Sequence, residues 1–261
     1  GIRDDLVTGV QTCALPISGR AWRAPNVNER YSQGVHHGTA QYEIGDADLG
    51  KERTWSVDGT LRHSGDRVTG QVAAYRNAIS GFIYLEPRAP VLSIRGAYPG
   101  FDYAQTDAVV TGLEMSGEVR LLRGVEFTFS GALLRGTDDI TNAPLYDMPA
   151  DRGTLGLRFT LPDASWVSRP FLSAGLTLVR EQDRVPEGTI YALPTDGYQL
   201  VDVELGAQSL QVNGRRINVG LEVRNLFDTS YRDYLSRYKL FVDDLGRDIV
   251  LRVRVPVGGA L

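Results

Sequence analysis

Apolar and polar residues alternate with a period of two over most of this sequence, and no other feature constrains the fold as strongly. The clearest segment is 215–226, where Ile217, Val219, Leu221 and Val223 occupy every second position and most residues between them are charged or polar. Successive side chains of a β-strand point to opposite faces, so this period is typical of strands and not of helices. We therefore predict an all-β, antiparallel fold.

Nine segments show the alternation, and a partial tenth lies near 19–24. Several run to 10–13 residues, which is longer than the usual strand of a soluble protein. A tilted strand needs about 9–11 residues to cross the hydrocarbon of a membrane. The nine predicted strands are 54–63, 67–85, 109–122, 125–135, 152–161, 169–181, 198–208, 215–226 and 247–257.

The connections between these strands alternate strictly between short and long. In an up-and-down antiparallel sheet, all the short connections then lie at one end of the strands and all the long ones at the other. Outer-membrane barrels have this asymmetry, with short periplasmic turns and long extracellular loops. We predict part of an antiparallel up-and-down transmembrane β-barrel. The predicted short connections are 64–66, 123–124, 162–168 and 209–214, and the long ones are 25–53, 86–108, 136–151, 182–197 and 227–246.

The two faces of the predicted strands differ in polarity as a barrel wall requires. Charged side chains are tolerable on the inner face, where water or opposite charges satisfy them. The face predicted to contact lipid includes Leu155, Leu157, Phe159, Leu172, Leu176 and Leu178. The face predicted to line the lumen includes Glu114, Glu118, Arg120, Arg152, Arg158 and Arg224.

Several classes of protein are excluded or disfavoured. The formal net charge is −4, from 28 basic and 32 acidic residues, so nucleic acid is not an expected partner. No apolar run has the 18 or so residues of a spanning helix. The three histidines lie near no recognisable nucleophile motif, and we predict that the chain is not an enzyme.

The segment 1–18 resembles a translated sequencing adapter. Its residues Gln11–Ile17 can be encoded by CAG-ACG-TGT-GCT-CTT-CCG-ATC, a common library adapter. We therefore expect residues 1–18 to be no part of the fold, and the domain to comprise residues 19–261.

The C-terminal stretch 222–255 resembles the closing strands of TonB-dependent outer-membrane receptors. The resemblance is carried by Asn225-Leu226-Phe227-Asp228-x-x-Tyr231 and then Gly246-Arg247. Two upstream segments are similar to further motifs of the family, in the same order and spacing. They are Arg23-Ala24-Pro25 with Glu29, and Tyr42-Glu43-Ile44-Gly45-Asp46-Ala47-Asp48-Leu49 with Glu52.

Within the family, some pieces look like the zinc-uptake subgroup. These are His36-x-x-Thr39, Pro194-Thr195-Asp196-Gly197-Tyr198, and Tyr231-Arg232-Asp233 with Ser236 and Lys239. The chain departs from that subgroup at Tyr234, where histidine is usual, and at Leu245, where proline is usual.

The resemblance implies TonB-dependent active uptake of a scarce metal or metal complex, such as a siderophore or zinc. Such receptors bind their ligand with extracellular loops and the apex of an N-terminal plug, on which the TonB complex acts. We expect residues 19–261 to supply about 9–10 strands of a barrel of about 22, without plug or TonB box. The implied partners are outer-membrane lipid, the TonB complex through the missing plug, and a small metal-complex ligand. No resident cofactor is expected, since any metal would arrive with the ligand.

Two other functions remain open from the residues alone. A passive outer-membrane channel or an adhesin barrel would have the same strand pattern without a plug. A soluble all-β binding module is the third possibility, because alternation suits any half-buried sheet.

The candidate binding residues lie in the two long connections 25–53 and 86–108. His36 and His37 form the only histidine pair, and imidazole is a common ligand of zinc, copper and iron. Solvated loop histidines are the alternative, since a zinc site usually needs three or four ligands. The other candidates for ligand contact are Tyr42, Glu43, Tyr98, Phe101 and Tyr103, of which the last three are aromatics that can stack on a chelate.

Overall fold

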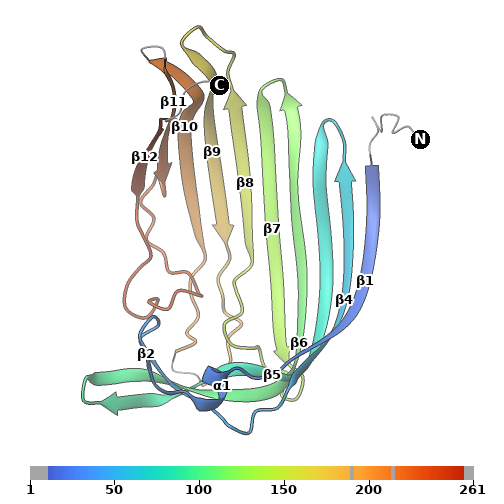
Figure 1. The fold of residues 1–261 in the computed structure, drawn as a ribbon, viewed down its shortest axis with the longest axis vertical. Helices are drawn as coiled ribbons and strands as arrows, with labels where there is room; N and C mark the ends of the chain where they lie inside the picture. Colours follow the sequence, from blue (N-terminus) through green and yellow to red (C-terminus); the bar gives the residue numbers. More distant parts are fainter. Residues whose placement is uncertain (1–10, 189–190, 213–214, 256–261) are drawn as a thin grey trace.

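The computed structural model describes residues 11–188, 191–212 and 215–255. Ten strands follow one another around a curved antiparallel sheet (Figure 1). They are β1 (Gln11–Arg23), β4 (Glu52–Ser64), β5 (Val68–Ser93), β6 (Gly96–Leu122), β7 (Val125–Asp138), β8 (Arg152–Thr160), β9 (Val167–Val179), β10 (Tyr198–Val212), β11 (Arg215–Arg224) and β12 (Asp248–Arg254). The prediction of an all-β, up-and-down antiparallel wall is confirmed.

The first long connection carries three further elements. They are a one-turn helix, α1 (Val27–Tyr31), and the short strands β2 (Gln33–His36) and β3 (Gln41–Ile44). β2 pairs with β3 in antiparallel fashion. β3 also forms a parallel pair with β6, in which Tyr42 lies opposite Gly100. No helix in the described part of the chain has the length and apolar content needed to cross a membrane.

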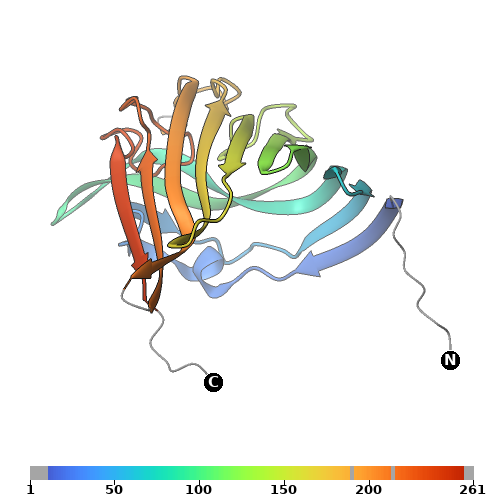
Figure 2. The same cartoon turned by 90° about the horizontal axis from the view of Figure 1, so that it is seen from above.

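Figure 2 shows the sheet as an open arc, with α1 and its neighbours on the concave side. The convex side carries rows of apolar side chains that remain exposed, as a surface for lipid requires. These include Val57, Leu61, Val72, Leu113, Met115, Leu133, Leu155, Phe159, Leu172, Leu178, Leu221 and Leu251. The register places the polar side chains on the opposite, inner face, among them Glu114, Glu118, Glu126, Arg158, Glu204 and Glu222.

Two predicted connections differ from the structure: residues 209–212 of the predicted connection 209–214 belong to β10, and the predicted loop 86–108 is wrong. The segment 86–108 was expected to be a long loop, but β5 and β6 continue through it to a tight turn between Ser93 and Gly96. β7 pairs with β6 only from Ala108 onward, so this hairpin projects beyond the sheet. It bends at an irregularity between Ile79 and Phe82, where Gly81 has a φ of 70° that a side chain would strain.

The long connections gather at one end of the sheet, the lower end in Figure 1. We call this end the mouth; it comprises 24–51, the projecting hairpin 82–107, 139–151, 180–188, 191–197 and 225–247. The short turns lie at the other end, as the alternation of connection lengths predicts.

A few predictions fall partly outside the described residues. Residues 1–10, positions 213 and 214 of the predicted connection 209–214, and positions 256 and 257 of the predicted last strand are among them. Gln11–Ser18 form part of β1 and pair with β4, with every side chain exposed. Their origin in an adapter is a question of DNA sequence and stays a prediction.

Candidate ligand-binding site

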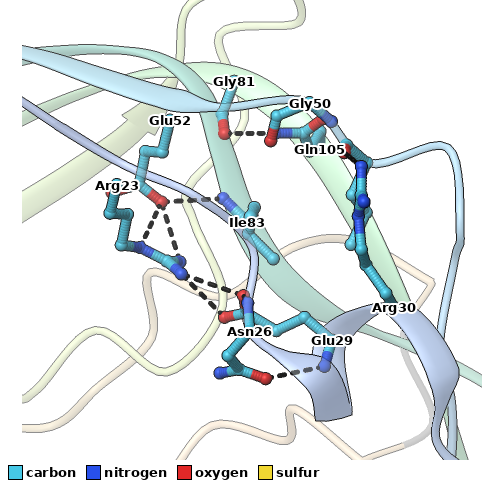
Figure 3. A network of polar contacts seen from close by, with 10 residues as sticks. Arg23, Asn26, Glu29, Arg30, Gly50, Glu52, Gly81, Ile83 and Gln105 are labelled. Carbon is cyan, nitrogen blue, oxygen red and sulfur yellow. Dashed lines mark hydrogen bonds and ion pairs between the residues drawn. The ribbon is translucent and has the colours of Figure 1, made fainter.

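The first mouth segment is fixed to the wall by a cluster of ionic contacts, drawn in Figure 3. The guanidinium of Arg23, at the end of β1, donates to both oxygens of Glu29 at 2.9 Å and to Glu52 at 3.1 Å. Glu29 also accepts from the backbone N–H of Asn26, and the Asn26 side chain accepts from the N–H of Glu29. This reciprocal capping box starts α1 and orients its carboxylate toward β1.

Gly45 permits the return of the chain against the helix. Its N–H donates to the carbonyl of Ser32 at 2.7 Å, and the next N–H, from Asp46, donates to the carbonyl of Glu29. A Cβ at position 45 would lie 2.5 Å from the backbone carbon of Arg30, which is closer than real contacts allow. The motif residues that carry the family resemblance here therefore have structural roles.

The mouth encloses a cavity of about 360 Å³, which we call the aromatic cavity. Five separate segments line it, at 39–41, 85–101, 146–147, 191–192 and 234–241. Its aromatic lining residues are Tyr98, Phe101, Tyr146, Tyr191, Tyr234, Tyr238 and Phe241. Such a lining suits a ligand with flat apolar surfaces, because aromatic rings stack on one another.

Three buried polar atoms in this lining have no hydrogen-bond partner among the described residues. They are the Oε1 of Gln41 and the hydroxyls of Tyr191 and Tyr234. Buried polar groups are nearly always paired, since an unpaired one loses its hydration without compensation. Three such atoms at one cavity leave hydrogen-bonding capacity there for water or for a bound polar ligand.

Tyr234 lies deepest in the lining, with 2% of its surface exposed. Burial, with a further contribution from Asp147, raises the pKa of its hydroxyl to about 12. The hydroxyl therefore keeps its proton at neutral pH and is a hydrogen-bond donor. Lys239 lies against the same ring, with its Nζ 3.7 Å from the ring centre, and burial lowers the pKa of that amine.

The structure brings two of the three predicted aromatic residues into the cavity. Tyr98 and the buried Phe101 line it, and the ring of Phe101 lies 5.4 Å from that of Tyr191. Tyr103 lies outside the lining and donates its hydroxyl to the buried carboxylate of Glu43 at 3.1 Å. Burial, and then Glu43, raise the pKa of Tyr103 to about 12.

Tyr42, half-buried on β3, does not line the cavity either. The two histidines are exposed at the β2–β3 turn. The Nδ1 of His36 lies 3.1 Å from the hydroxyl of Thr39, which is part of the lining. In the described residues, no group of three or more His, Cys, Asp or Glu side chains is placed to hold a metal ion. Metal binding by His36 and His37 stays a prediction.

The last mouth segment is fixed to the inner wall through Asp233. Its carboxylate accepts from Arg152 at 2.7 Å and from the hydroxyl of Tyr198 at 2.9 Å. Burial raises the pKa of Asp233, but the backbone N–H of Leu235, Tyr198 and Arg152 outweigh this effect and lower it overall. Tyr231 completes the contact, with its ring 4.5 Å from that of Tyr198.

The C-terminal motif closes the base of this same segment. Asn225, with a φ of 47°, exchanges two hydrogen bonds of 2.8 Å with the backbone of Thr229. Asp228 accepts from the backbone N–H of Arg247 at 2.7 Å. The motif therefore joins the two ends of 225–247 and positions the cavity-lining residues between them.

Sequence reasoning missed five of the aromatic lining residues. Tyr146, Tyr191, Tyr234, Tyr238 and Phe241 come from three different connections, and only the fold brings these connections together. An available signal was that tyrosine and phenylalanine recur in the long connections and not in the short ones.

A family model for the TonB dependent receptor-like β-barrel matches residues 18–226, most of the chain. The chain belongs to this family. Membership agrees with the convex apolar wall and places the protein in the outer membrane of a Gram-negative cell. The members of this family are transporters and not enzymes. Membership therefore argues against the alternative that the chain is a soluble all-β binding module.

The relatives are similar over about a third of their own length. Heme/hemopexin utilization protein C of Haemophilus influenzae is 23% identical over 242 residues, covering 83% of this chain and 32% of that protein. The copper transporter OprC has a TM-score of 0.74 at 19% identity, covering 93% of this chain and 36% of that one. The ferric enterobactin receptor PfeA of Pseudomonas aeruginosa has a TM-score of 0.63 at 17% identity, covering 91% of this chain and 37% of that one. At these identities the structures establish the fold and not the ligand.

Proposed function

We propose that this chain is part of a receptor that imports a metal complex across the outer membrane in a TonB-dependent manner. We further propose that the aromatic cavity contacts this cargo on the extracellular side. Support comes from the family and from its relatives, whose names refer to heme, copper and ferric enterobactin. The TonB complex would act through a plug, as the family resemblance implies.

The observation that carries the cargo class is the set of unpaired buried hydroxyls in an aromatic lining. A chelate with flat rings and anionic oxygens would stack on the rings and accept hydrogen bonds from the hydroxyls of Tyr191 and Tyr234. Bare zinc fits less well, because a hydroxyl with a pKa of about 12 at Tyr234 is a poor metal ligand at neutral pH. A siderophore or a heme-like chelate is therefore the cargo class we favour over zinc.

The histidines fit this proposal as peripheral contacts. His36 hydrogen-bonds Thr39, which lines the aromatic cavity, and His37 follows it on the same turn. Either imidazole could contact a chelate that protrudes from the cavity.

The test uses cells that produce the complete receptor containing this chain, with and without TonB. Radiolabelled ferric catecholate, hemin and zinc ion are offered separately. We expect a chelate to accumulate only when TonB is present. Tyr234→Phe should weaken chelate binding about tenfold, roughly the free energy of one hydrogen bond, while leaving folding intact because the hydroxyl forms no hydrogen bond with a described residue.

Tyr238→Phe is the matched control, since Tyr238 lines the same cavity but is 55% exposed. Its binding should stay close to that of the unmodified receptor. Uptake of zinc ion alone, or equal effects of the two substitutions, would contradict the proposed cargo class. Uptake that continues without TonB would contradict the proposed mechanism.

A further inference from the structure

The convex face carries a second cavity near the mouth, of about 570 Å³, at the ends of β1, β4 and β5. Arg20 lies opposite Trp55 in the β1–β4 register, and Trp22 lies opposite Arg53. These four side chains share the face that carries the exposed Val57 and Leu61, so they point outward and not into the lumen.

The two tryptophans mark this level as a membrane boundary. Trp22 is 66% exposed and Trp55 is 50% exposed, and both lie at strand ends next to the long connections. Tryptophan is enriched where the hydrocarbon of a bilayer meets its headgroups. The rows of apolar side chains begin immediately toward the centre of the strands, at Val57.

The basic residues at this level have no carboxylate partner within the described chain. Arg20 and Arg53 form no ion pair there, and Lys51 makes only a cation–π contact, 4.7 Å from the ring centre of Trp22. Several other arginines of the wall are paired, including the outward Arg135, which binds Asp151 through two contacts, whereas the outward Arg76 forms no ion pair with a described residue. A positive charge at the edge of hydrocarbon needs a counter-charge, since its hydration is reduced there.

Two acids also border the cavity, and they do not neutralise the cluster. Asp107 is engaged by the hydroxyl of Ser80 at 3.1 Å and the N–H of Gly81 at 2.9 Å. Asp139, directly after the end of β7, also lines the cavity. The three basic residues and the two aspartates together give the lining a net positive charge. The basic residues lie on β1, on β4 and next to β4.

We propose that Arg20, Lys51 and Arg53 bind the phosphate groups of a glycolipid in the outer leaflet of the outer membrane. The guanidinium groups would hold phosphate oxygens through paired hydrogen bonds, and the two tryptophans would pack against the upper acyl chains. Lipid binding here requires only that this face points outward, and it does not depend on which cargo the receptor imports. It can therefore be tested independently of the proposed function.

The test compares lipid A with lipid A lacking its phosphates, bound to the complete receptor in detergent and followed by native mass spectrometry. Arg20→Gln with Arg53→Gln should weaken lipid A binding about 30-fold, given the usual contribution of a basic residue at a membrane surface. The control is Arg67→Gln with Arg123→Gln, which removes two exposed charges beside the short turns at the opposite end. This control should bind lipid A like the unmodified receptor.

A second measurement does not depend on the variants. Raising the salt concentration should weaken the binding of lipid A far more than that of the dephosphorylated lipid, because salt screens exposed charges. Three results would overturn the proposal: equal binding of the two lipids, equal losses in the two double variants, or inorganic phosphate binding as tightly as lipid A. The last result would indicate a site for a soluble anion.

Discussion

Replacing Arg23 by methionine tests whether the ionic cluster at the end of β1 holds the first mouth segment in place. The substitution keeps an apolar stem but leaves Glu29 and Glu52, with side chains only 10% and 14% exposed, without their shared cation. Breaking a fully buried pair costs about 3–5 kcal/mol. Arg23 itself is 42% exposed, so water screens part of the effect, and we expect about 2 kcal/mol.

Hydrogen exchange gives a local measure of this loss. The N–H groups of Asn26 and Asp46 bond to the side chain and the carbonyl of Glu29, and they exchange when the segment opens. A loss of about 2 kcal/mol raises the opening equilibrium, and so the exchange rate, by about 30-fold. The amides in the middle of β8 should be unaffected.

Arg88→Met is the matched control. Arg88 pairs with Asp102 at 2.9 Å, but both side chains are about 40% exposed. An exposed pair contributes roughly 0.5 kcal/mol, so exchange near it should accelerate only about twofold. If Arg23→Met accelerates exchange in its segment no more than Arg88→Met does in its own, the cluster does not anchor the mouth.

Two further predictions concern the other anchors of the mouth. Gly45→Ala should destabilise docking of the first segment by about 1–3 kcal/mol, because the new Cβ would lie 2.5 Å from the backbone of Arg30; limited proteolysis would detect the freed segment. The contact of Asp233 with Arg152 should weaken in acid: its folded pKa is lowered, so its stabilisation is present above the unfolded value of about 3.9 and is lost as pH falls through the folded pKa. Proteolysis of 225–247 should therefore accelerate below about pH 4 and stay constant between pH 8 and 5. A rate that stays constant from pH 8 to below pH 4 would contradict the assignment.

The wall of the protein was predictable from the sequence because its cause is local. Each strand must present one face to lipid and one to water, and this requirement leaves a period of two in segments such as 152–161. The alternation of short and long connections likewise predicted that the long connections gather at one end of the strands, which is the mouth. The helix α1 was missed, although Asn26 and Glu29 have the spacing of a capping box.

The projecting hairpin was not predictable in this way. Pro87, Pro90 and Pro99 interrupt the alternation there, and such residues are typical of loops. The hairpin extends instead because β5 and β6 pair with each other as far as Ser93 and Gly96, and β3 adds a parallel pairing at Gly100 from a distant part of the chain. The aromatic cavity could not be predicted either, because its lining is assembled from five segments that are distant in the sequence.

The anchors of the mouth and the lining of its cavity are different residues. Arg23, Glu29, Asp233 and Asn225 fix the segments to the wall, and none of them lines the aromatic cavity. A substitution in the lining that preserves side-chain size, such as Tyr234→Phe, therefore leaves the contacts between the anchors and the wall in place. If the cavity contacts the cargo as proposed, single substitutions in the lining would change the preference for cargo and leave every anchor in place.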